Sequence, residues 1–180
     1  MSRTWLVGVI AALPCLAVAG WAQESAAHIP VAHGTSLAGT AVALPDAIKG
    51  KTAVLLVGFS HASQGQVTNW GRLIATDFGR APAFAYYELP ILGGAPKILR
   101  GMIIKSMGKA VPESEKPHFI PLTEDDKPWR AVAHYNKSDD AYVLIVDGEG
   151  LVRWQTEGDA TDAAYAVVKK KLAGMLAVAH

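Results

Sequence analysis

Cysteine is almost absent from this chain: its 180 residues contain one, Cys15. A single Cys excludes an intramolecular disulfide framework and a vicinal dithiol. Excess charge of either sign is also missing, since 17 Lys and Arg residues are balanced by 16 Asp and Glu. A formal net charge of +1 provides no global field for holding nucleic acid, which is therefore not an expected partner. With 51% hydrophobic and 18% charged residues, the composition is that of a globular domain and not of a disordered chain.

Residues 1–22 are expected to be a secretory signal peptide. Arg3 precedes an apolar run over residues 5–19, and the small residues that follow are typical of a cleavage site near Ala22. Cleavage there predicts a periplasmic or secreted protein without a transmembrane segment; a retained membrane anchor is the alternative. Cys15 would be removed with this segment. The exported chain would then have no thiol, which excludes thiol oxidoreductase and peroxidase activity.

The rest of the chain divides into a short lead-in and one domain. Residues 23–38 are small, polar and without periodicity, and are expected to form a mobile lead-in. The domain is expected over residues 39–180. Its apolar runs and spacings predict strands at 40–44, 52–59, 83–87, 142–146 and 151–155, and helices at 63–78, 95–109, 123–135 and 161–177.

The order of these elements predicts the fold class. The run at 52–59 is apolar throughout, which is typical of a central strand covered on both faces. A helical crossover to 83–87 implies a parallel pair, whereas the short turn after Val146 implies an antiparallel hairpin. We therefore expect an α/β fold: a mixed β-sheet with flanking helices on both faces and a late antiparallel hairpin.

The helix predicted at 95–109 has two different sides. Apolar residues at three- and four-residue spacing follow one side, which ordinarily packs on a core. They are Ile98, Leu99, Met102, Ile103 and Met107. The other side carries four cations without an acid, namely Lys97, Arg100, Lys105 and Lys109. This basic side is a candidate surface for an acidic partner segment or for anionic lipid head groups; the alternative is a solvated face.

Two patches of the sequence resemble a known superfamily. Residues 50–70 (GKTAVLLVGFSHASQGQVTNW) and 142–154 (YVLIVDGEGLVRW) resemble a thioredoxin-like domain of the thiol oxidoreductase and peroxiredoxin type. Within that superfamily, the closer resemblance is to the mitochondrial ATP synthase assembly-factor family. The residues that carry it are Phe59-Ser60, then Gln66 and Trp70 in QVTNW, and then Asp147, Arg153, Trp154 and Gly158.

The resemblance implies a thioredoxin-like fold without its usual chemistry. The two redox Cys of such domains would fall near Gln64 and Val67, and their cis-Pro near Ala141, yet this sequence has neither Cys nor Pro there. Taken with the predicted signal peptide and the absent thiols, the resemblance implies an exported, redox-inactive module for binding, assembly or chaperoning, with a protein partner that is membrane-associated or free. No cofactor is expected.

The loop after the central strand is a second candidate site. Ser60, His61, Ser63 and Gln64 lie there, just before a predicted helix N-terminus. In the functional interpretation, His61 is a general base or ligand and the other three are hydrogen bonders of a non-thiol enzyme or small-ligand binder. In the structural interpretation, the Ser residues cap the helix and His61 is an exposed loop residue.

No metal site is predicted. The six His residues are scattered without a ligand spacing, at His28, His33, His61, His118, His134 and His180. A weak copper or nickel contact at His28 and His33 is the alternative. In the predicted hairpin, we expect Trp154 to pack in the core and Arg153 to pair with Asp147 or Glu157.

Overall fold

The structure, a computed structural model, describes residues 27–178. The strands are β1 (Ala32–Thr35), β2 (Ala41–Leu44), β3 (Thr52–Gly58), β4 (Phe84–Pro90), β5 (Ala141–Val146) and β6 (Val152–Glu157). The helices are α1 (Gln64–Phe78), α2 (Lys97–Ala110), α3 (Lys127–Val132) and α4 (Asp162–Val178), with short 3₁₀ turns η1 (Asp46–Ile48) and η2 (Lys116–His118). The predicted signal peptide and its cleavage site near Ala22 lie outside the described residues.

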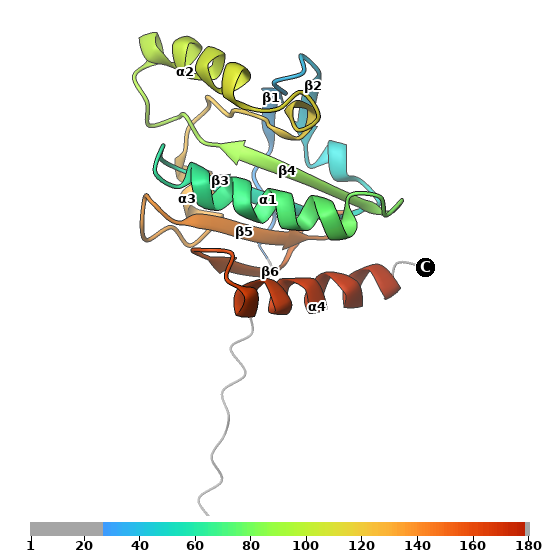
Figure 1. The fold of residues 1–180 in the computed structure, drawn as a ribbon. Helices are drawn as coiled ribbons and strands as arrows, with labels where there is room; N and C mark the ends of the chain where they lie inside the picture. The colour runs from blue at the N-terminus through green and yellow to red at the C-terminus, as the bar shows by residue number, and fades with distance from the viewer. Residues whose placement is uncertain (1–26, 179–180) are drawn as a thin grey trace, which may run out of the picture.

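The main sheet has four strands in the order β4-β3-β5-β6 (Figure 1). Strand β3 pairs in parallel with β4 and antiparallel with β5. Strands β5 and β6 form an antiparallel hairpin with an irregularity between Ile145 and Val146. A separate hairpin joins β1 to β2. The predicted α/β fold, with a mixed sheet and a late hairpin, is therefore confirmed.

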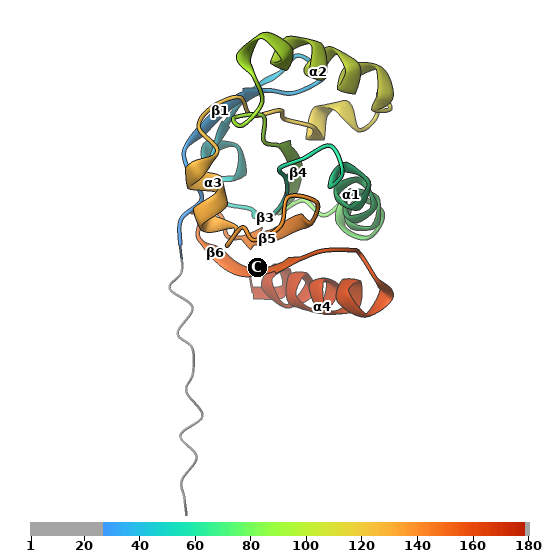
Figure 2. The ribbon, with the colours of Figure 1, turned by 90° about the vertical axis from the view of Figure 1, so that its left-hand side faces the viewer.

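Strand β3 lies at the centre of the molecule because its side chains are apolar on both faces. All seven of its residues are buried, as the continuous apolar run predicted. Leu55 and Val57 belong to a core with the β1–β2 hairpin and α3, whereas Val54 and Leu56 belong to a core with α1 and α4. Figure 2 shows these two layers on opposite sides of the sheet.

The predicted mobile lead-in at 23–38 is wrong for its described part, because residues 32–35 form β1. Ala32 and Leu44 are register partners across the β1–β2 pair, and both are buried. Ile29 is also buried, and its N–H donates to the Gly150 carbonyl at 2.9 Å. Burial and pairing with distant segments thus order a stretch whose own sequence has no strand periodicity.

Two helix expectations also need correction. The third helix begins at Lys127, and Asp126 at its N-cap binds Arg130 instead of capping the backbone. The predicted capping box that started at Thr123 is therefore wrong. In α4, Val168 and Leu172 are buried as expected, but Val167 is 47% exposed because the core contacts only the adjacent side of the helix.

Candidate functional site

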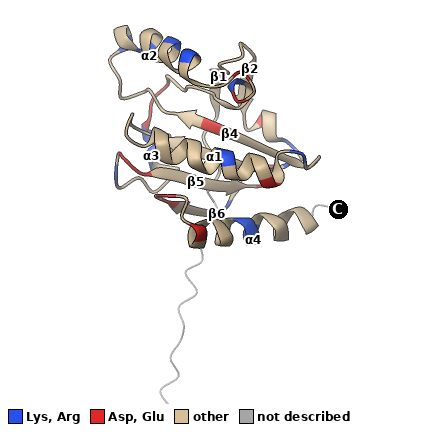
Figure 3. Ribbon diagram, viewed as in Figure 1, with Lys and Arg blue, Asp and Glu red and all other residues tan. Residues whose placement is uncertain are grey.

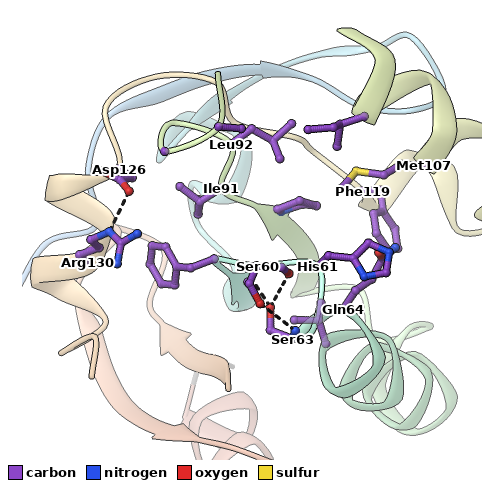
Figure 4. Close-up of a pocket in the computed structure, with 17 residues that line it drawn as sticks. Ser60, His61, Ser63, Gln64, Ile91, Leu92, Met107, Phe119, Asp126 and Arg130 are labelled. Atoms are coloured by element: carbon purple, nitrogen blue, oxygen red, sulfur yellow. Dashed lines mark hydrogen bonds and ion pairs between the residues drawn. The ribbon is translucent and has the colours of Figure 1, made fainter. Parts of the chain in front are cut away.

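A cavity of about 330 Å³ opens at the C-terminal end of β3, where Gly58 leads into the loop before α1 (Figure 4). Its lining comes from that loop, the first turn of α1, the segment after β4, α2, Phe119, and the start of α3. Most of the lining is apolar, and includes Phe59, Val67, Ile91, Ile103, Met107 and Phe119. The size and apolar character suit one large apolar side chain or a small apolar ligand.

The serine residues of the loop hold its conformation. The Ser63 N–H donates to Ser60 Oγ at 3.2 Å, and the Ser63 hydroxyl donates to the Ser60 carbonyl at 2.9 Å. The Ser60 hydroxyl donates to Asp139 Oδ1 at 3.2 Å. Gly58 allows the loop to pack closely, because a Cβ there would lie 2.8 Å from Ser63 Oγ. Ser63 occupies the N-cap position of α1 without a side-chain capping bond, so the expected capping role is wrong.

His61 and Gln64 lie beside the serine pair, on one wall of the cavity (Figure 4). All four candidate residues of the loop, Ser60, His61, Ser63 and Gln64, are thus brought together. His61 is exposed, and its imidazole ring makes no hydrogen bond to any other residue between 27 and 178; only its backbone carbonyl accepts a bond, from the Gln64 N–H at 3.3 Å. A catalytic His is ordinarily oriented by a second group, and the described part of the loop supplies none.

Arg130 provides the positive charge at the opposite wall, but it is already paired. Its Nε donates to Asp126 Oδ2 at 2.7 Å, and its guanidinium lies 5.0 Å from the Phe59 ring centroid and 3.9 Å from that of Tyr135. The hydrogen bond with Asp126 raises the pKa of Arg130. Stacking and pairing hold this side chain in place, so the cavity has little free charge.

Helix α2 borders the cavity and contains no buried residue. Ile103 and Met107 line the cavity, whereas Ile98, Met102 and Leu99 are 90%, 64% and 40% exposed. The expectation that the whole apolar side packs on a core is therefore wrong. The spacing indicates one side of a helix but not what covers it. We call the exposed residues Ile98, Leu99 and Met102 the α2 ridge.

The basic side of α2 is also divided. Arg100 donates to the carbonyls of Ala95, Thr123 and Gly93 at 2.9, 2.6 and 2.7 Å, so it fastens the helix to two loops. Sequence reasoning missed this structural role of Arg100, because the sequence identifies the cation but not the carbonyls to which it donates. Lys97, Lys105 and Lys109 are exposed and have no ion pair with any residue of 27–178. Figure 3 shows Lys and Arg at several places along α2.

The family-like residues on α1 connect that helix to the hairpin. Gln66 Oε1 accepts the Ala141 N–H at 2.8 Å, at the start of β5. Trp70 is fully buried, and its Nε1 donates to the Gly158 carbonyl at 2.9 Å. Gln66 and Trp70 therefore position the two strands of the hairpin relative to α1, which is a structural role.

The family-like residues of the hairpin also have structural contacts. Arg153 Nη2 lies 2.6 Å from Asp147 Oδ2, which confirms the expected pair. Asp147 also accepts the N–H groups of Glu149 and Leu151 at 3.0 Å. Burial opposes ionisation of Asp147, but these hydrogen bonds and Arg153 lower its pKa. Trp154 packs, partly buried, against the core beneath α4.

Sequence reasoning missed Glu88, a buried acid on β4. It is 2% exposed, and its Oε2 has no hydrogen-bond partner among residues 27–178. Burial, together with the nearby charge of Glu115, raises the pKa of Glu88 to about 8. Gly71 on α1 leaves the room it needs, because a Cβ there would lie 2.2 Å from Glu88 Oε1. The available signal was one acid within the apolar strand sequence FAYYELP.

The positions of the redox residues of thioredoxin-like domains are occupied by other residues. Gln64 is the first residue of α1, and Val67 lies one turn later, with both beside the cavity. Among the described residues the cis peptide bond is Leu44–Pro45, far from Ala141 in sequence. Within 27–178, no three metal-ligating side chains are grouped to hold an ion, and no helix has the length and apolarity to cross a bilayer.

Known proteins resemble this chain in sequence or in fold. Residues 17–175 match the model of the family described as ATP10 protein. A sequence search of curated proteins found no match. Among solved structures, the exposed lipoprotein thioredoxin Etrx1 of Streptococcus pneumoniae superposes with a TM-score of 0.58 at 14% identity, over 79% of this chain and 100% of that one.

Two further structures agree on the fold. A putative thiol:disulfide interchange protein DsbE from Chlorobium tepidum gives a TM-score of 0.56 at 15% identity, over 82% of this chain and 95% of that one. BsSco, of the Sco family of cytochrome c oxidase assembly proteins, gives a TM-score of 0.56 at 11% identity, over 86% of this chain and 94% of that one. The fold is therefore thioredoxin-like, as the resemblance implied.

Proposed function

Because this chain belongs to the ATP10 protein family, we propose that it is an exported, redox-inactive assembly module that holds an apolar segment of a partner protein. The family match and the thioredoxin-like fold support an assembly or chaperone role. The apolar run before Ala22 supports export to the periplasm or beyond. The absence of Cys after position 15 supports a function without thiol chemistry.

One observation carries the proposal: α2 presents large apolar side chains to solvent beside an apolar cavity. Ile98 at 90% exposure and Met102 at 64% are the most exposed of the α2 ridge. Ile103 and Met107 continue this apolar side into the cavity. An apolar surface that no part of the described chain covers is typical of a binding surface. In this arrangement the cavity receives one large side chain, and the ridge contacts its neighbours.

Small-ligand binding is the second candidate, favoured by the cavity itself. Its volume of about 330 Å³ lies within the range of ligand pockets, and His61 and Gln64 supply polar groups at one wall. This function requires the cavity but not the α2 ridge. Substitutions in the ridge therefore distinguish the two candidates.

The test compares three forms of the protein in affinity capture from envelope extracts. Ile98→Asp with Met102→Asp should abolish recovery of the co-purifying protein, because a carboxylate on each exposed position opposes apolar contact. Val31→Asp is the control, since Val31 is 70% exposed and lines neither the cavity nor the hollow between β1 and α2. Equal recovery with all three forms would contradict the proposal and leave the small-ligand candidate.

A further inference from the structure

A second hollow lies at the other end of β3, and nothing in the proposed function uses it. Thr52, the first residue of β3, lines this groove, whereas Gly58, the last, lines the cavity described above. The groove has a volume of about 980 Å³ and lies between the turn at Gly50, the turn at Gly148 and α4.

The groove is lined by cations from separate parts of the chain. Lys51 follows the turn at Gly50, and Lys170 and Lys171 lie on α4. These three side chains are exposed and have no ion pair with a described residue. Lys169 differs, because its Nζ lies 2.7 Å from Asp77 Oδ2 on α1. The acid in the groove, Asp147, is already bonded to Arg153, so the positive charge is not neutralised.

Apolar side chains lie between these cations. Val167 and Val178 are 47% and 85% exposed, and Trp154 and Met175 are partly exposed in the same groove. Gly174 opens the space beside them, because a Cβ there would have no atom within 4 Å. A ligand for this groove therefore needs both negative charge and apolar surface.

The shape of the groove favours a protein segment over a membrane. Its lining follows α4 from Val167 to Val178. At 1.5 Å per residue, this stretch is roughly 16 Å long, or about three helical turns. A bilayer surface is flat and would contact the projecting edges, whereas a single peptide segment fits a hollow between a helix and two turns.

We propose that this groove binds an acidic amphipathic segment of a partner protein. Carboxylates of that segment pair with Lys51, Lys170 and Lys171, and its apolar side chains pack on Trp154 and Met175. Because the groove and the cavity lie at opposite ends of β3, one molecule can hold two segments at once. This inference does not depend on the α2 ridge.

The test uses two fluorescent probe peptides, an amphipathic helix of Leu and Glu and the same helix with Lys in place of Glu. The protein should bind the Glu peptide and not the Lys peptide, and added salt should weaken the binding. Lys170→Glu with Lys171→Glu should lower the affinity by about tenfold or more. The matched control, Lys97→Glu with Lys105→Glu, makes the same change of charge on α2 and should leave the affinity unchanged.

A second variant tests the groove by shape. Gly174→Leu fills the open space without changing charge, and should also weaken binding of the Glu peptide. Equal loss of affinity in the α2 control would overturn the proposal, because it would show a general charge effect. Binding to anionic phosphatidylglycerol vesicles without binding to the Glu peptide would also overturn it, in favour of a lipid surface. Neither outcome bears on recovery of a partner through the α2 ridge.

Discussion

Helices α1 and α2 are similar in length and apolar spacing but differ in burial. On α1, Val67, Trp70 and Ile74 are at most 3% exposed. On α2, no residue is buried, and Ile98 is 90% exposed. The sheet and α4 cover the apolar side of α1, whereas a cavity and solvent face that of α2. The difference indicates that α1 stabilises the fold, and it is the basis of our proposal that the apolar side of α2 contacts another molecule.

The largest expected effect is on α1. Trp70→Ala should lower the free energy of unfolding by about 3–5 kcal/mol, because it leaves a cavity in the core and removes the bond to Gly158. Chemical denaturation monitored by circular dichroism measures this change. A loss of less than about 1 kcal/mol would mean that α1 is not part of the stabilising core.

Arg100 differs from the exposed residues of α2, because it contributes to the stability of the fold. Arg100→Met should cost about 1.5–3 kcal/mol, because it removes a charged donor from three carbonyls. Lys105→Met, the matched control on the exposed side, should change the free energy of unfolding by no more than about 0.5 kcal/mol. Equal effects of the two substitutions would show that Arg100 does not fasten α2.

Glu88 makes the stability of the α1 side depend on pH. Its folded-state pKa is raised to about 8 from 4.5, so the folded protein binds a proton more tightly than the unfolded chain. The contribution of this tighter proton binding to the free energy of unfolding is fully present below about pH 4.5, and is lost as the pH rises through about 8. Glu88→Gln should remove this dependence and raise the free energy of unfolding at pH 8 by about 1–3 kcal/mol.

The measurement for Glu88 is the thermal unfolding midpoint between pH 5 and pH 8, with Glu149→Gln as a control in the exposed turn after β5. The parent protein and the Glu149 variant should lose stability across this interval by similar amounts. An unchanged pH dependence in the Glu88→Gln variant would show that Glu88 is ionised in the folded protein throughout.

The smallest expected effect is on the α2 ridge. Met102→Ser should change the free energy of unfolding by no more than about 0.5 kcal/mol, since Met102 is 64% exposed. Denaturation under the conditions used for Trp70→Ala gives the direct comparison. A loss similar to that of a core residue would show that α2 is part of the stabilising core after all.

The sequence predicted the sheet better than it predicted the site. The apolar run of β3 and the turn after Val146 were sufficient for the mixed sheet and its hairpin, because their patterns are local. The sequence did not predict that residues 32–35 form the strand β1, because this strand depends on burial of Ile29 and Ala32 by distant segments.

The loop residues Ser60, His61, Ser63 and Gln64 were predicted to lie together because they are neighbours in sequence. The contribution of α2 to the cavity was not predicted, because Ile103 and Met107 meet the loop only through the tertiary fold. Likewise, the acceptors of Arg100 come from two separate loops, and the sequence contains no local signal for them.

Site-specific photo-crosslinking from α2 tests the central claim most directly. A photo-reactive amino acid at Met102, on the exposed α2 ridge, should crosslink to an apolar segment of one partner protein in envelope extracts. The same amino acid at Val31, which is 70% exposed and lines neither the cavity nor the hollow between β1 and α2, should not crosslink to that protein. Crosslinks to the same protein from both positions, or from neither, would contradict the account that α2 is the docking surface.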